Sequence, residues 1–235
     1  GAGDAEGMRQ SLRFKLIVAL GLSALHTALC LLAPEALIGF MLGGNAEGGE
    51  IVKEGARFLK EVAPSFIPIA LSSSLATSYR DVGRARMPLA VSSAAAAICT
   101  VLNWVLIYGN LGAPRLEVSG AALATDIARL AEAGAFVAVV AVGKPSFSFR
   151  PSALFRLDRS LFRSILGRSW MMFFSEIGWV MSETVITAIY NGRGGAETVA
   201  GMAAGFTIAN LFFMAFGAVV TATSVIVGST LGAGH

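Results

Sequence analysis

Six long apolar stretches constrain this chain of 235 residues more than any other feature. They cover residues 14–33, 62–79, 87–109, 118–142, 165–190 and 199–228. A transmembrane helix needs about 20 mostly apolar residues, so each stretch is long enough to cross a bilayer. None of them shows the alternation with a period of two that marks a half-buried strand. The sequence therefore predicts an all-α membrane protein, a polytopic bundle of six transmembrane helices.

The composition supports a membrane protein over a soluble one. Hydrophobic residues make up 55% of the chain and charged residues 14%, whereas soluble domains carry roughly 25% charged residues. There are only two cysteines, Cys30 and Cys99, and both lie in apolar stretches, which excludes a disulfide framework. Pro64 and Pro68, four residues apart, predict a kink near the start of the second span.

Lysine and arginine residues are distributed unevenly between the two sets of connections. Eleven lie around the start of the first span and in the connections after the second and fourth spans, against five in the alternate connections. Because basic residues favour the cytoplasmic side, we expect both ends of this segment to be cytoplasmic in a multi-pass plasma (inner) membrane protein. The same distribution explains the net charge of +3 without a nucleic-acid partner.

The first span also shares features with a signal peptide, since basic residues precede an apolar run that contains small residues. The run is about 20 residues long, which exceeds a usual signal core, and five further spans follow it. We therefore expect the first span to remain in the protein rather than to be cleaved.

Three ionisable residues occupy the fourth span. Asp126, Arg129 and Glu132 follow one another at intervals of three, so on a helix both acids can reach the same guanidinium. Ionisable groups inside a bilayer are costly and commonly mark an ion or substrate path. Two interpretations stay open for these residues, a structural ion network and a direct role in transport.

Two more acids lie in the fifth span. Glu176 and Glu183 are seven residues apart and share one helix face. Glu176 has no basic residue in its own span beyond Arg168, two turns earlier, which favours a protonatable or cation-binding carboxylate. The role of Glu183 is open, because partners on other helices cannot be identified from the sequence. His26 in the first span is expected to be a hydrogen-bonded structural residue.

Several short segments occur in an order and spacing typical of one transporter family. They are Arg-Ala-Arg-Met-Pro at 84–88, Leu-Asn-Trp-Val-Leu-Ile-Tyr-Gly-Asn-Leu-Gly at 102–112, Val-Ser-Gly-Ala-Ala-Leu-Ala-Thr at 118–125, Ser-Glu-Ile-Gly-Trp at 175–179, Ala-Ile-Tyr-Asn-Gly at 188–192 and Val-Gly-Ser-Thr-Leu-Gly-Ala-Gly at 227–234. Together they resemble the multidrug and toxic compound extrusion (MATE) family of secondary transporters.

This resemblance implies twelve helices in two six-helix lobes, with the compound and the coupling cation bound in a central cavity. A Gly-Ala-Gly sequence at 1–3 and again at 232–234 is similar to a motif that ends the family's second and eighth helices. The chain would then be a fragment covering the third to eighth helices. Residues 1–142 would be the last four helices of the amino-terminal lobe, 143–164 a basic cytoplasmic linker between the lobes, and 165–235 the first two helices of the carboxy-terminal lobe.

The resemblance also implies roles for single residues. Asn103 matches one of two polar positions that help to bind a cation in the amino-terminal lobe, and Cys99 occupies the other. A thiol is a poor ligand for Na⁺, which prefers oxygen. Thr125 matches a residue of the same region, and Glu176 matches the carboxylate of the carboxy-terminal lobe.

The expected function is an antiporter that exports drugs or other organic, cationic compounds by alternating access. The coupling ion would be Na⁺ or H⁺, with no other cofactor, and the partners would be the bilayer and the remaining helices of the transporter. Arg129, an arginine within the membrane, lends some support to a flippase of lipid-linked sugars from the same superfamily. A membrane-embedded enzyme is a weaker alternative. The sequence has only two histidines and neither an HExxH nor a GxSxG motif, so it lacks a recognisable combination of catalytic residues. A purely structural or signalling bundle is a further alternative, against which the intramembrane acids argue.

Overall fold

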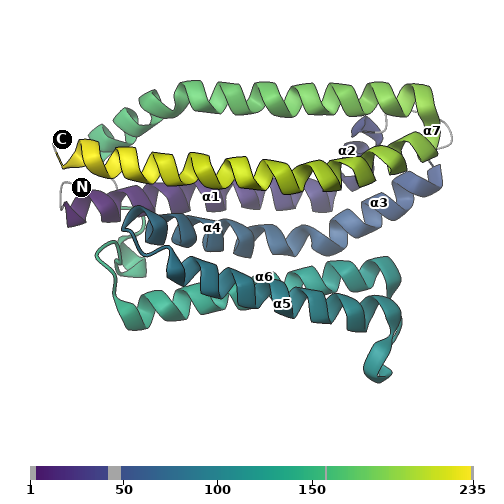
Figure 1. Cartoon of the computed structure of the whole chain (residues 1–235), viewed down its shortest axis with the longest axis horizontal. Coiled ribbons are helices and arrows are strands. Elements are labelled where there is room, and N and C mark those ends of the chain that lie inside the picture. Colours follow the sequence, from purple (N-terminus) through teal and green to yellow (C-terminus); the bar gives the residue numbers. More distant parts are fainter. Residues whose placement is uncertain (1–3, 42–48, 157, 234–235) are drawn as a thin grey trace. The chain divides into compact units, whose positions relative to one another are not determined.

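A computed structural model describes residues 4–41, 49–156 and 158–233 of the chain (Figure 1). Within these ranges the chain is helical and contains no strand. The α-helices are α1 (Ala5–Leu32), α2 (Pro34–Met41), α3 (Gly49–Val62), α4 (Phe66–Asp81), α5 (Arg86–Tyr108), α6 (Glu117–Gly143) and α7 (Arg159–Gly232). Residues 1–3 and 234 lie outside the described residues, so the first Gly-Ala-Gly copy and the end of the second are not described.

The chain divides into two compact units. The larger unit comprises Asp4–Pro34 and Glu54–Phe162, and the smaller unit comprises Gly1–Gly3, Glu35–Lys53 and Arg163–His235. The predicted boundaries of lobes and linker, 1–142, 143–164 and 165–235, stay a prediction.

Four of the six predicted spans form helices long and apolar enough to cross a membrane. These helical segments are Ala5–Leu32, Arg86–Tyr108, Arg159–Tyr190 and Ala200–Gly232. The predicted span 62–79 is interrupted by a 3₁₀ helix at Ala63–Ser65, after which α4 runs for only 16 residues. The predicted span 118–142 forms α6, whose middle carries the three ionisable residues. The protein is therefore an all-α membrane protein, and the predicted kink near Pro64 is present.

The larger unit is built from an α5–α6 hairpin, with α4 packed against α6 and α1 packed against α4 (Figure 1). Gly120 allows the two hairpin helices to approach closely. A Cβ atom at this position would lie 2.6 Å from the carbonyl oxygen of Leu106. The backbone N–H of Leu116 also donates to that Leu106 oxygen at 2.9 Å. The close approach fixes the register in which polar residues of α5 and α6 face each other.

The segment that follows α6 packs onto the larger unit. Phe147 is 1% exposed, and its ring meets the ring of Tyr79 edge-on with centroids 5.0 Å apart. Arg13 of α1 donates to the carbonyl oxygen of Arg156 at 3.0 Å and lies over the ring of Phe149. Residues 147–156 therefore pack against α1 and α4 rather than forming a free tether.

The smaller unit consists mainly of α7, which turns back on itself (Figure 1). The rings of Trp179 and Phe213 lie with centroids 6.2 Å apart. These residues are 34 positions apart, and a straight helix would separate them by about 50 Å. The reversal falls between the two spans that end at Tyr190 and begin at Ala200. Large apolar side chains such as Met171 and Leu211 are exposed on both arms, as is typical of helices that face lipid or further helices.

Candidate functional site

Glu132 forms a buried polar cluster between α6 and α5. Its side chain is only 5% exposed, and both carboxylate oxygens accept a hydrogen bond. Arg129 Nη1 donates to Oε2 at 2.8 Å, and Ser92 Oγ of α5 donates to Oε1 at 2.7 Å. Hydrogen bonds to an ionised acceptor are roughly twice as strong as neutral ones. Glu132 is therefore satisfied, and it connects the two helices.

A cavity of about 270 Å³ lies beside this cluster, between α4, α5 and α6. Polar side chains form most of its wall, and the full lining is Ile69, Ser72, Ser73, Ala76, Thr77, Arg80, Ser92, Arg129 and Glu132. The α4 residues recur at intervals of three and four, so they occupy one face of that helix. The cavity brings Arg80 of α4 together with Arg129 of α6, a pair that lies 49 positions apart in the sequence.

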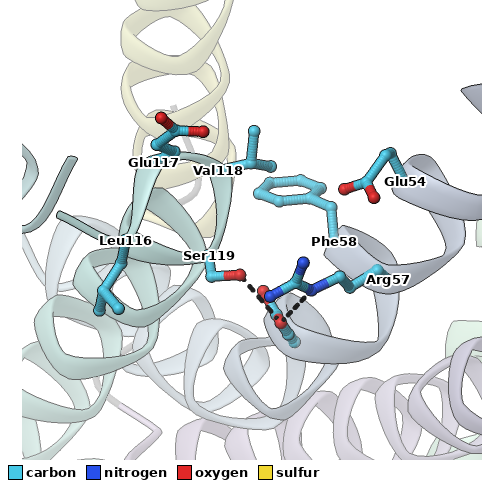
Figure 2. A pocket seen from close by; sticks show the side chains of 8 residues that line it. Glu54, Arg57, Phe58, Leu116, Glu117, Val118 and Ser119 are labelled. Atoms are coloured by element: carbon cyan, nitrogen blue, oxygen red, sulfur yellow. Dashed lines mark hydrogen bonds and ion pairs between the residues drawn. The ribbon is translucent and has the colours of Figure 1, made fainter.

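A second polar cluster surrounds Glu61, near the end of α3 (Figure 2). Its Oε1 accepts from Arg57 Nε at 3.1 Å and from Ser119 Oγ of α6 at 3.0 Å. Figure 2 shows Arg57 and Ser119 pointing toward this same carboxylate. The other oxygen, Oε2, is buried and has no hydrogen-bond partner within the described residues.

Asp126 faces the same region from α6. It lines a cavity of about 260 Å³ together with Glu61, Ser119 and two leucines. Its Oδ1 atom is buried and has no hydrogen-bond partner in the part of the chain that the structure describes. Arg57 balances one of the two negative charges of Glu61 and Asp126, so one negative charge remains uncompensated. Such a site can take up one proton or one monovalent cation, because either would neutralise a carboxylate that is otherwise costly to bury.

The structure divides the acidic stripe predicted on α6. Arg129 forms its ion pair with Glu132, whereas Asp126 has no ion pair among the described residues and faces Glu61 instead. Sequence reasoning missed Glu61, because it lies among several glutamates of a charged helix. Ser119, which donates to it, and Asp126, which lines the same cavity, follow only 58 and 65 positions later. Its only local signal was Arg57, one helical turn earlier.

Asn103 and Thr125, predicted as cation-binding residues, lie on α5 and α6. The Nδ2 group of Asn103 donates to Cys99 Sγ at 3.6 Å, while its Oδ1 is buried and has no partner within the described chain. Thr125 Oγ1 donates to the backbone oxygen of Ala121 at 2.9 Å, which leaves its lone pairs as acceptors. Both residues can offer oxygen to a ligand, and their role stays a prediction.

The predicted carboxylates Glu176 and Glu183 lie on the first arm of α7. Glu176 is exposed and Glu183 is half-buried, and neither forms an ion pair with any described residue. Their role in binding a cation or substrate likewise stays a prediction. His26 lies with Nε2 3.6 Å from Cys30 Sγ and its ring against that of Phe66, which agrees with a structural role.

Among the residues that the structure describes, no group of three or more His, Cys, Asp or Glu side chains is arranged to hold a metal ion. The polar atoms available to a ligand are carboxylate, amide and hydroxyl oxygens together with guanidinium groups.

Comparison with known proteins identifies the chain's relatives. The MatE family model matches residues 1–108. Three curated relatives carry the name probable multidrug resistance protein NorM. The protein from Bradyrhizobium diazoefficiens is 34% identical over 71% of this chain and 35% of its own length. Those from Bacillus cereus and Thermotoga maritima are 26% and 25% identical over 90% and 96% of this chain, and over 48% and 47% of their own lengths.

The chain thus spans about a third to a half of the length of these curated relatives. No solved structure gives a significant match. The family match covers α1 to α5, and the relatives extend the similarity through α6 and α7. The order of motifs, the all-helical membrane fold and these matches agree: residues 1–108 carry a MatE domain, and most of the chain is similar to proteins named multidrug resistance protein NorM.

Proposed function

We propose that this chain is part of a secondary active transporter that exports drugs or other organic compounds in exchange for Na⁺ or H⁺. The name multidrug resistance protein, shared by the relatives, supports export of organic compounds rather than enzymatic chemistry. The apolar helical spans support a multi-pass membrane location. The distribution of basic residues supports cytoplasmic ends for this segment.

The observation that carries the proposal is the unpaired carboxylate oxygen of Asp126. This atom is buried on a predicted membrane helix, and it faces a cavity that also contains Glu61. The backbone N–H of Ser65 donates to the Asp126 carboxylate, but no basic group among the described residues forms an ion pair with it. A carboxylate without an opposite charge is expensive inside a membrane, so uptake of a proton or Na⁺ would stabilise the state in which Asp126 is buried. A group of this kind couples ion occupancy to conformation.

In the proposed cycle, an organic cation and the coupling ion compete for carboxylates while the lobes rock about the bound site. Asp126 would serve in the amino-terminal lobe, with Asn103 of α5 and Thr125 of α6 as neutral oxygen donors. Glu176 would serve in the carboxy-terminal lobe, with Glu183 about two turns further along the same helix. The segment 143–164 would connect the lobes on the cytoplasmic side.

Ethidium efflux from cells that produce the intact protein tests this proposal. We expect efflux that stops when the proton gradient and the Na⁺ gradient are both collapsed. Asp126→Asn and Glu176→Gln should each reduce the efflux rate at least tenfold, because both remove a titratable charge without changing side-chain size. Glu117→Gln is the matched control, since Glu117 is exposed and pairs only with Arg115 among the described residues. Equal efflux by all three variants and the unaltered protein would refute the proposal.

A further inference from the structure

Beyond the proposed export activity, we infer that the cavity beside Glu132 is a binding site for an oxyanion, a carboxylate or a phosphate group. Arg80 and Arg129 contribute two positive charges to its wall and Glu132 contributes one negative charge. The wall therefore carries a net charge of +1, which a monoanion neutralises. This charge has the opposite sign to that of the cavity of Asp126 and Glu61, so the two cavities favour different ligands.

Arg129 is held in position for such a contact. Glu132 takes one hydrogen bond from Nη1, and Ser92 fixes the other oxygen of that carboxylate. A guanidinium has five N–H donors, and its flat fork matches carboxylate and phosphate oxygens. The Arg129 side chain is 46% exposed, so donors remain accessible from the cavity. A guanidinium that its neighbours already orient loses less entropy when it binds a ligand.

Arg80 supplies the second charge from the last turn of α4. It is half-buried at the cavity wall and forms no ion pair with any described residue. Hydroxyl groups line the same face of α4. The hydroxyls of Ser72 and Thr77 donate to backbone oxygens of their own helix. The guanidinium groups are thus the main free donors of the cavity, which favours an anion over a cation.

The size of the cavity limits what it can hold. A volume of about 270 Å³ is slightly below the range of roughly 300–1,000 Å³ that encloses a drug-sized molecule. It is large enough for one carboxylate or phosphate group and a few waters, each of which occupies about 30 Å³ in the liquid. The ligand is therefore a small organic anion or the anionic end of a larger molecule, such as an anionic lipid.

Binding measurements on the purified intact protein test this inference in two arms. The first arm titrates benzoate into the protein in a zwitterionic detergent and follows the heat released. The second arm compares the melting temperature in nanodiscs of phosphatidylcholine with that in nanodiscs containing phosphatidylglycerol. Both arms use Arg80→Gln, Arg129→Gln and the control Arg86→Gln, which changes an exposed arginine at the start of α5 that does not line the cavity.

In the first arm, we expect Arg80→Gln and Arg129→Gln each to weaken benzoate binding about tenfold. In the second arm, we expect each to reduce the stabilisation by phosphatidylglycerol by more than half. Arg86→Gln should leave both unchanged. A response to benzoate alone identifies a small organic anion, and a response to phosphatidylglycerol alone identifies a lipid headgroup. Absence of both responses in the unaltered protein, or equal responses in all variants, would overturn the inference.

Two features keep the test decisive. Arg80 has no ion pair to lose among the described residues, so its replacement probes anion binding without breaking the Glu132 cluster. Arg129→Lys keeps the charge but loses the fork, and it should recover part of the affinity lost in Arg129→Gln. Neither arm measures transport, so failure of the export proposal leaves this result interpretable.

Discussion

Ser92 on α5 donates a 2.7 Å hydrogen bond to the buried carboxylate of Glu132 on α6, forty positions later in the chain. This bond and the ion pair with Arg129 together satisfy both oxygens of Glu132. The most buried carboxylate of the described residues is thus fully paired, whereas Asp126, six residues earlier, retains an unpaired oxygen. We therefore propose different roles for these two acids, a structural one for Glu132 and ion coupling for Asp126.

Replacing Ser92 by alanine should destabilise the protein. The substitution leaves one oxygen of a buried carboxylate without its donor, which costs about 1–3 kcal/mol. Unfolding in mixed detergent micelles as the fraction of dodecyl sulfate rises measures this change. The matched control is Ser93→Ala, because Ser93 is the exposed neighbour on the same helix. Equal stability of the two variants would show that the Ser92 bond contributes nothing.

Gly120→Ala should disrupt the α5–α6 hairpin. The added Cβ would lie 2.6 Å from the Leu106 oxygen, a contact with backbone that cannot move aside without shifting a helix. Overpacking of this kind typically costs about 1–3 kcal/mol. Gly134→Ala on the same helix is the control, since nothing lies within 4 Å of the atom it adds. The same unfolding assay should give a large loss for position 120 and little change for position 134.

Arg13→Met should release the segment that follows α6. It removes the hydrogen bond to the Arg156 oxygen and the charge over the Phe149 ring while keeping an apolar side chain of similar length. Limited trypsin digestion should then cleave after Arg156 several-fold faster, because local opening exposes that bond. Arg9→Met, which removes an exposed surface pair with Glu6, should leave the rate unchanged. A rate unaffected by either substitution would contradict the packed arrangement of this segment.

Protonation of Asp158 should weaken the start of α7. The backbone N–H of Ser160 donates to its Oδ1 at 2.8 Å, and this bond, with a further one from the Ser160 side chain, lowers the pKa of Asp158 below its usual range near 3.9. Because the folded pKa is depressed, the stabilisation is present above the unfolded pKa and is lost as pH falls through the folded value.

Carbon-13 chemical shifts of the Asp158 carboxyl should therefore show a pKa below the usual range of aspartate. Asp158→Ala should speed amide exchange in the first turn of α7 at neutral pH. Asp158→Asn, which keeps an acceptor oxygen, should do so less. A titration above the usual aspartate range would contradict the capping role.

Local sequence signals predicted the helices well. The apolar stretches gave α1, α5 and both arms of α7, since the length of an apolar run is a local property. Pro64 predicted the break between α3 and α4, because a proline lacks the N–H that a continuous helix requires. The residues Asp126, Arg129 and Glu132 were also identified as the ionisable part of the fourth span.

The pairing of those side chains could not be predicted, because it depends on contacts between helices. Glu61 reaches the cavity of Asp126 from a helix 65 positions earlier, and Ser92 reaches Glu132 from another. The burial of Phe147 against Tyr79 was likewise invisible in a segment rich in basic residues, whose composition suggested only an exposed linker. The expectation that Glu176 and Glu183 bind a cation or substrate still rests on the sequence alone.

Ion counterflow in proteoliposomes tests the central claim most directly, namely that Asp126 couples ion movement to export. Vesicles containing the intact protein and a pH-sensitive dye receive ethidium under an imposed proton gradient, and a parallel series uses a Na⁺ gradient with a Na⁺-sensitive dye. We predict that ethidium evokes proton or Na⁺ movement in the unaltered protein, and that Asp126→Asn abolishes it while Glu117→Gln does not. Ion movement of equal size in Asp126→Asn and the unaltered protein would contradict the claim.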